Sequence, residues 1–209
     1  MGSDDLFKKR KLERRRKKRI IAPDRFLIVC EGEKTEPNYF KSFKEMINQK
    51  KKHSVDIEIK GEGANTISLV KAAIQLKEQA NPDYSQVWCV FDKDSFTNEQ
   101  FNEACQMAEQ NDIFLAYSNE SFELWYVLHF EYSQSALTRY QYVEKLKSYL
   151  GDYKKNQKNI YELLNEHGNQ KMAFSYAEKL CENVKCESYA RKNPSTTVHR
   201  LVAELQRFI

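Results

Sequence analysis

Two uninterrupted apolar runs limit the folds that this chain can adopt. Phe26–Cys30 and Val87–Phe91 contain no charged or hydroxyl-bearing side chain, a pattern typical of strands covered by helices on both faces. Residues 54–59 instead alternate between apolar and polar, as a half-exposed edge strand does. A fourth strand is predicted at 113–117. Interior strands of this kind occur mainly in parallel sheets, so a parallel sheet is expected here.

Helical patterns separate the predicted strands. They cover 35–49, 66–79 and 97–110, and Thr35 is the predicted N-cap of the first of these helices. Strands that alternate with helices favour an α/β fold. After about residue 121 the pattern is helical throughout, with helices predicted at 121–130, 138–149, 157–166, 170–185 and 196–208. We therefore predict an open, mainly parallel four-stranded sheet flanked by helices (23–135), followed by a C-terminal helical extension packed on that core (136–209).

The positive charge of the chain is concentrated at its start. Residues 1–20 hold 10 Lys or Arg and 3 Asp or Glu, a net charge of +7, whereas the remainder holds 24 basic and 27 acidic residues, a net charge of −3. We predict that residues 1–22 form a flexible basic tail. Such a tail neutralises nucleic-acid phosphates without reading sequence. The alternative is a disordered or merely solubilising segment.

Cysteine usage and hydropathy indicate a cytoplasmic protein. The five cysteines form no Cys-x-x-Cys pair, so free thiols in a reducing compartment are expected and a zinc site is not. No apolar run approaches the roughly 20 residues that a membrane span needs. The basic stretch is not followed by the apolar region of a signal peptide. We expect no association with membranes.

Acidic side chains follow both interior strands. Glu31 comes directly after the first run, and Asp92 and Asp94 follow the second. Because the carboxyl ends of parallel strands meet at one edge of a sheet, these side chains are expected to lie together. Their mutual repulsion favours a hard divalent cation, and Mg²⁺ prefers oxygen ligands of this kind. We predict that Glu31, Asp92 and Asp94 bind the metal, with Glu31 as an alternative general base. Taken singly, an acid at the end of a strand usually forms a turn or caps a helix.

Further candidate residues lie in the helical part of the chain. Glu123 stands in the first turn of a predicted helix and is interpreted as a metal ligand or a base, the alternative being complementation of the helix dipole. Trp125 and His129 are predicted to belong to the core. Ser195 or Thr196 is the predicted N-cap of the last helix.

Several stretches resemble known sequences. A strand that ends in Glu31-Gly32 and a later strand that ends in Asp92-x-Asp94 are similar to the Toprim domain of topoisomerases, primase-type enzymes and nucleases of the overcoming-lysogenization-defect class. From about residue 22 to the end, the chain resembles the RloB family. The resembling stretches are Ile28–Phe40, Val90–Asp94, Ser118–Trp125 and Asn193–His199.

The resemblance implies a Toprim-like fold and a role in prokaryotic defence against phages, by abortive infection or a related mechanism. It also implies a metal-dependent nuclease, encoded near restriction-modification or similar loci. Lys155 matches a position that the family tends to keep basic, which implies contact with phosphate or stabilisation of transition-state charge. The alternative is an ordinary solvated run of charges. Members of the family often have Pro at the position of Glu120.

These observations favour a Mg²⁺-dependent, or Mn²⁺-dependent, phosphodiesterase that cuts DNA or a structured RNA such as tRNA. Its predicted catalytic residues are Glu31, Asp92, Asp94, Glu123 and Lys155. One alternative is a non-catalytic adaptor that binds nucleic acid and works with a partner ATPase or another defence component. Another alternative is a phosphotransferase acting on small nucleotides. The sequence predicts no particular oligomeric state.

Overall fold

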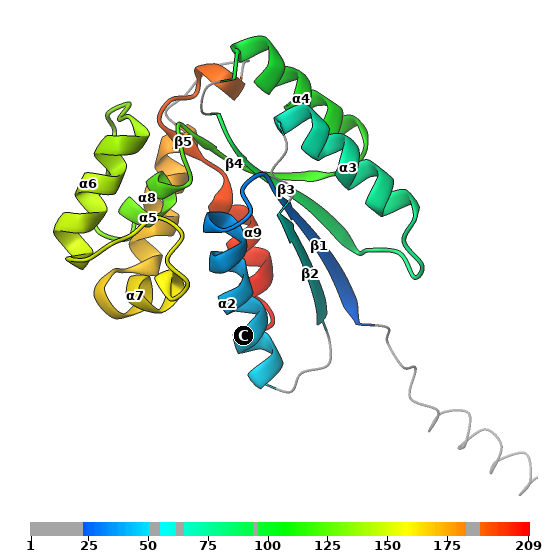
Figure 1. Cartoon of the computed structure of the whole chain (residues 1–209), viewed down its shortest axis with the longest axis horizontal. Coiled ribbons are helices and arrows are strands. Elements are labelled where there is room, and N and C mark those ends of the chain that lie inside the picture. The colour runs from blue at the N-terminus through cyan, green and yellow to red at the C-terminus, as the bar shows by residue number, and fades with distance from the viewer. Residues whose placement is uncertain (1–22, 51–54, 62–64, 94–95, 183–188) are drawn as a thin grey trace, which may run out of the picture.

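The structure is a computed structural model that describes residues 23–50, 55–61, 65–93, 96–182 and 189–209. The predicted basic tail and Asp94 lie outside the described residues. Four parallel strands form most of the sheet, and a short antiparallel strand completes it in the order β2-β1-β3-β4-β5 (Figure 1). The strands are β1 (Asp24–Cys30), β2 (Val55–Gly61), β3 (Gln86–Asp92), β4 (Phe114–Asn119) and β5 (Ser195–Thr196).

Helices cover both faces of the sheet and form a group beside it. Helices α3 and α4 lie on one face, α2 and α9 lie on the other, and α5 to α8 gather at one side (Figure 1). Their bounds are α2 (Thr35–Gln49), α3 (Thr66–Glu78), α4 (Asn98–Gln110), α5 (Glu123–Val127), α6 (Arg139–Leu150), α7 (Ile160–His167), α8 (Gln170–Glu182) and α9 (Val198–Gln206), with a 3₁₀ turn η1 (Tyr189–Arg191). None of the described helices is long and apolar enough to cross a membrane.

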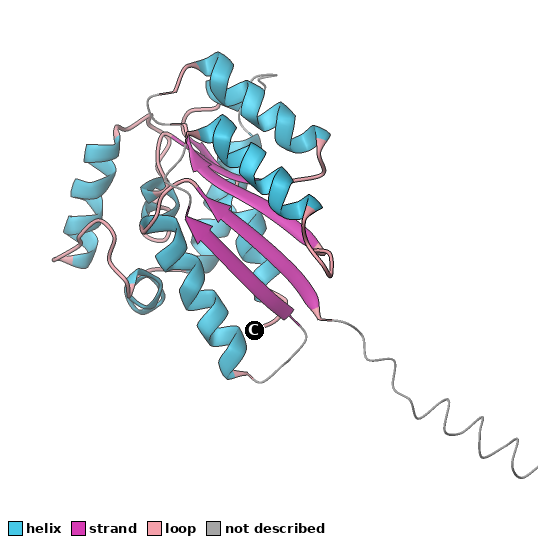
Figure 2. Ribbon diagram, turned by 45° about the vertical axis from the view of Figure 1, so that its right-hand side comes forward, coloured by secondary structure: helices cyan, strands magenta, loops and turns pink. Residues whose placement is uncertain are grey.

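The apolar run of β1 is buried on both faces, as predicted. Phe26, Ile28 and Cys30 belong to the core beneath α2 and α9, whereas Leu27 and Val29 belong to the core beneath α3 and α4. Successive side chains of a strand point to opposite faces, so each layer of helices needs its own apolar set from the strand. This confirms the α/β class and the mainly parallel sheet. The arrowheads of the parallel strands point to one edge of the sheet (Figure 2).

Within the residues that the structure describes, the sheet has five strands rather than the predicted four. Ser195 and Thr196 pair with Asn119 and Ser118 of β4, and the hydroxyls of Ser118 and Thr196 lie 3.0 Å apart. The predicted cap of the last helix is therefore wrong, because these two residues pair in the sheet and α9 begins at Val198. A strand of two polar residues has no hydrophobic period, and nothing in the sequence distinguishes it from a helix cap.

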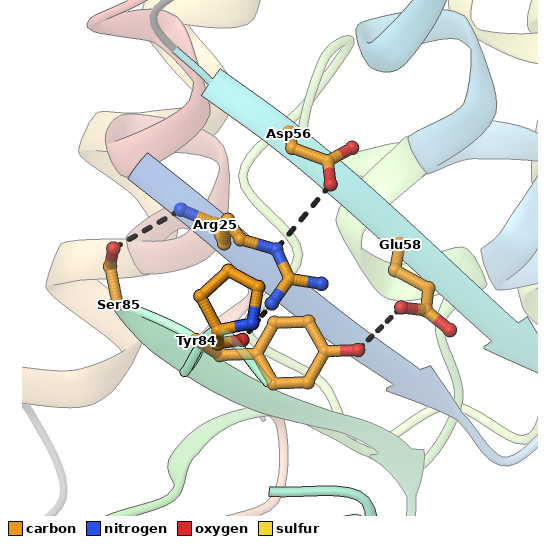
Figure 3. A network of polar contacts seen from close by, with 6 residues as sticks. Arg25, Asp56, Glu58, Tyr84 and Ser85 are labelled. Atoms are coloured by element: carbon orange, nitrogen blue, oxygen red, sulfur yellow. Dashed lines mark hydrogen bonds and ion pairs between the residues drawn. The ribbon is translucent and has the colours of Figure 1, made fainter. Parts of the chain in front are cut away.

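A polar network closes the edge of the sheet where β1 and β2 begin (Figure 3). The Arg25 guanidinium lies 3.6 Å from the Asp56 carboxylate and 4.5 Å from the centre of the Tyr84 ring. The Tyr84 hydroxyl donates a hydrogen bond to Glu58. The backbone N–H of Arg25 donates to the Ser85 hydroxyl at 3.1 Å. Every charged side chain in this network therefore has a partner of opposite charge or a hydrogen-bond donor.

Candidate functional site

A pocket of about 460 Å³ lies at the opposite edge, where β1 and β3 end. It is lined by residues from six parts of the chain: the turn after β1, the end of β3, the starts of α2, α5 and α6, and the loop before α7. The acidic lining residues are Glu31, Glu33, Glu36, Asp92 and Glu123, and the basic ones are Lys34, Lys155 and Arg139. Four predicted residues thus meet in one place, namely Glu31, Asp92, Glu123 and Lys155.

Pairing between β1 and β3 brings Glu31 beside Asp92. Cys30 and Val90 are partners in the sheet, and the Glu31 backbone N–H continues the ladder by donating to the Val90 carbonyl at 2.9 Å. The Glu31 side chain then turns back, and its Oε2 accepts a hydrogen bond from the Asp92 backbone N–H at 3.2 Å. The expectation that these two strands are neighbours is confirmed.

Asp92 is a buried carboxylate with 8% exposure. Burial raises its pKa well above the usual value, and the negative charges of Glu36 and Glu123 raise it further. The Arg139 guanidinium, 3.5 Å from Asp92 Oδ2, opposes this shift. Oδ1 of Asp92 is buried and accepts no hydrogen bond from the described part of the chain.

Glu36 and Glu123 add two more buried carboxylates to the pocket, with exposures of 5% and 1%. Glu36 stands in the first turn of α2, and Glu123 is the first residue of α5. Burial raises the pKa of Glu36, and the neighbouring Glu123 raises it further. Oε2 of Glu36 and Oε1 of Glu123 have no hydrogen-bond partner among the described residues. A buried acceptor without a donor is costly, so these oxygens are poised to meet a cation or a proton.

Glu36 was not predicted from the sequence. Its position in the first turn of a helix is one that an acid commonly occupies for the helix dipole alone. The one feature of the sequence that relates to the position of Glu36 is Gly32. A Cβ on Gly32 would lie 2.2 Å from Glu36 Oε2, so a glycine is needed there for the carboxylate to keep this position. Gly32 therefore lets the Glu36 carboxylate lie against the turn that carries Glu31.

Lys155 reaches the pocket because its loop is tied to the start of α2. The Thr35 hydroxyl donates to Asn156 Oδ1 at 2.8 Å, and the Asn38 amide donates to the Asn156 carbonyl at 3.0 Å. Asn156 has a φ of 69°, a left-handed conformation that Asn tolerates better than most residues. The prediction that Thr35 is the N-cap of this helix is therefore wrong. Lys34 occupies that position without a side-chain cap, and the Thr35 hydroxyl is used to hold the loop.

The aromatic and histidine candidates of the helical part belong to the core, as predicted. Trp125 is fully buried and donates from Nε1 to the Tyr39 hydroxyl at 2.9 Å. His129 Nδ1 lies 2.9 Å from the Trp125 carbonyl. Burial lowers the pKa of His129 to about 4, so the ring is neutral at physiological pH. Neither residue lines the pocket.

The chemistry of the pocket suits a hard divalent cation. Three buried carboxylate oxygens have no hydrogen-bond donor in the described part of the chain, and they belong to Glu36, Asp92 and Glu123. Within the described residues, no group of three or more His, Cys, Asp or Glu side chains already converges on a common point where a metal could be held. Mg²⁺ keeps several waters and is commonly held by only one or two carboxylates. Glu31 and Asp92, on adjacent strand ends, provide such a pair.

Comparison with known proteins places the chain in a family. Residues 26–205 match the family model described as RloB-like protein. This range contains every residue that lines the pocket. No curated protein and no solved structure matches the chain significantly.

Proposed function

The chain belongs to the RloB-like protein family, and we propose that it is a metal-dependent nuclease. In this proposal Glu31 and Asp92 hold a Mg²⁺ or Mn²⁺ ion, with Asp94, which lies outside the described residues, as a further ligand. The observation that supports it most is a set of buried carboxylate oxygens that have no hydrogen-bond donor among the described residues, in the same pocket as the basic side chains of Lys155 and Arg139. In metal-dependent phosphodiester hydrolysis carboxylates hold the cation, and basic side chains beside them can neutralise the phosphate.

The basic side chains of the pocket receive the substrate. Lys155 and Arg139 line the pocket together with the acids, and both lower the pKa of Glu36 by their charge. A phosphate bound between Lys155 and Arg139 would be neutralised by their positive charges. The bound cation would supply Lewis-acid polarisation of the phosphate and an activated water. The hydrogen bonds between Asn156 and the start of α2 fix the backbone beside Lys155. Lys155 is therefore positioned before the reaction begins.

The buried pair of Glu36 and Glu123 handles the proton. Two neighbouring carboxylates cannot both ionise easily, and the raised pKa of Glu36 reflects burial first and then this repulsion. One of the pair is therefore suited to take a proton from the attacking water and return it to the leaving oxygen. Glu123 serves as the predicted base in this scheme.

The proposed substrate is DNA or a structured RNA such as tRNA, and the proposed role is cytoplasmic defence of a prokaryotic cell against phages. Both follow from the resemblance to defence nucleases that carry the Glu-Gly and Asp-x-Asp strand ends. A partner ATPase or another defence component would license the activity.

The test is hydrolysis of a mixed pool of DNA and RNA by the full chain with and without Mg²⁺ or Mn²⁺. Cleavage is expected to need the cation and to disappear in Asp92→Ala and Glu31→Gln. Glu58→Gln is the matched control, since Glu58 also lies on a strand of the sheet but belongs to the network near the opposite edge. Binding without turnover that survives Asp92→Ala and is lost on deletion of residues 1–20 would instead indicate an adaptor. Turnover of nucleotides without polymer cleavage would indicate a phosphotransferase.

A further inference from the structure

Arg139 contacts the same carboxylate in the pocket that a bound metal ion would contact. It is the first residue of α6, a helix in the group beside the sheet, and its Nη2 lies 3.5 Å from Asp92 Oδ2. Asp92 is the residue to which the proposed function assigns the cation. The inference drawn here rests on that proposed function.

The local structure of α6 indicates that Arg139 serves the pocket rather than its own helix. A cation in the first turn of a helix is unfavourable, because the amino end of the helix carries a partial positive charge. The start of α6 is stabilised without it: the Thr138 backbone N–H donates to Gln141 Oε1 at 2.8 Å, and the Gln141 backbone N–H donates to Thr138 Oγ1 at 3.4 Å. The guanidinium is instead offset by acids of the pocket, since it acts electrostatically on both Asp92 and Glu36.

A guanidinium and a divalent cation cannot share Asp92 without strong repulsion. At the separation of 3.5 Å between Arg139 and Asp92, a cation bound to the same carboxylate would stand within a few ångströms of a second positive charge. Metal binding must therefore displace Arg139 from Asp92 or be weakened by it. The side chain can move without unfolding α6, because it is one-third exposed.

We propose that Arg139 is a displaceable counter-ion, which neutralises Asp92 while the metal is absent and passes to a substrate phosphate when the metal binds. A guanidinium binds phosphate oxygens in a two-pronged geometry that suits this second position. Metal and nucleic acid then favour each other's binding, since each removes an obstacle to the other. Arg139 thereby weakens metal binding until substrate is present.

The experiment measures the affinity of the full chain for Mn²⁺ by electron paramagnetic resonance of the free ion, without nucleic acid. Arg139→Met removes the charge and keeps most of the volume. It is expected to bind Mn²⁺ about fivefold or more tightly than the wild type, the lower end of typical coupling between two ligands. Arg139→Lys, which keeps the charge, is expected to stay within about twofold of the wild type. Lys145→Met is the control, because Lys145 is on the same helix but pairs with Glu131 at 2.6 Å outside the pocket.

A second arm measures binding of a fluorescent oligonucleotide with and without Ca²⁺, an oxygen-seeking cation used here without turnover. Addition of Ca²⁺ is expected to tighten binding to the wild type and to Lys145→Met by a larger factor than binding to Arg139→Met. Equal or weaker Mn²⁺ affinity in a folded Arg139→Met protein would overturn the proposal. So would loss of the native circular dichroism in both Arg139→Met and Arg139→Gln, since Arg139 would then be a structural residue.

The two proposals fail in different ways. Absence of nucleic-acid cleavage under every condition would contradict the nuclease and leave the comparison of Mn²⁺ affinities in force. Equal Mn²⁺ affinities in an active nuclease would contradict only the role of Arg139. If neither the wild type nor any variant bound Mn²⁺, both proposals would be overturned.

Discussion

The two edges of the sheet carry similar residues and use them in opposite ways. At the edge where β1 begins, Arg25 meets Asp56 and Tyr84 meets Glu58, so each acid has a partner. Where β1 and β3 end, the described pocket contains more acids than bases and leaves buried oxygens without donors. The first arrangement stabilises the sheet, whereas the second leaves charge available for a ligand.

The pKa values of the acids record this difference. The hydrogen bond from Tyr84 lowers the pKa of Glu58, while burial and neighbouring acids raise the pKa of Asp92. The same type of group is therefore stabilised in its charged form at one edge and destabilised in that form at the other. A bound cation would stabilise the charged form of Asp92. The difference between the pKa shifts of Asp92 and Glu58 therefore favours a functional role for Asp92.

The largest expected effect is on activity. Asp92→Ala and Glu31→Gln remove the proposed metal ligands, and each should lower the rate of nucleic-acid cleavage by at least about 100-fold, since even residues behind metal ligands cost up to that factor. Glu58→Gln should stay close to the wild-type rate. Cleavage rates of the purified proteins in Mg²⁺ check this. Comparable losses in Glu58→Gln and Asp92→Ala would erase the functional distinction between the two edges.

The next effect is on stability and concerns two glycines near the pocket. A Cβ on Gly61 would lie 2.7 Å from the Gly32 carbonyl oxygen and 2.8 Å from Glu33 Cα, which are backbone atoms. Gly61→Ala should therefore cost about 1–3 kcal/mol, as overpacking does. Gly32→Ala meets only the movable end of the Glu36 side chain, so it should cost less stability and instead disturb the pocket. Urea unfolding of both variants measures the difference.

A smaller effect separates the two edges in the absence of metal. Asp92→Asn removes a buried, repelled charge and should raise the free energy of unfolding by about 1 kcal/mol. Glu58→Gln weakens a partly exposed interaction and should lower it by about 0.5–1 kcal/mol. For a chain of this size 1 kcal/mol corresponds to a change in Tm of about 2–4 °C. Thermal melts in EDTA would contradict the comparison if both substitutions changed Tm in the same direction.

The smallest expected effect is the pH dependence of the change in Tm caused by Asp92→Asn. Because the pKa of Asp92 is raised in the folded state, folding favours its protonated form. The stability linked to this group is full below its ordinary pKa of 3.8 and is lost as the pH rises through the higher folded value. The Tm advantage of Asp92→Asn should therefore grow from pH 5 to pH 8 and shrink when Mg²⁺ is added. A gap that stayed constant with pH would show that Asp92 does not titrate in this range.

The parts of the fold that follow from a local pattern of apolar residues could be predicted from the sequence. The apolar runs of β1 and β3 and their order in the chain were enough to place Glu31 beside Asp92. Arg139 escaped prediction because it comes from α6, 47 residues away from Asp92, and no local pattern says where that helix packs. Glu36 escaped because an acid in a first turn has an ordinary explanation, and β5 because two residues carry no period. Packing between distant segments decided all three.

The most direct test of the metal centre is a crystal of the full chain soaked in Mn²⁺, with the ion located by its anomalous scattering. Glu31 and Asp92 are predicted to bind it directly, with oxygen distances of about 2 Å. An ion found at another place, or a pocket that stays empty at saturating Mn²⁺ while nucleic acid is still cleaved, would contradict the account.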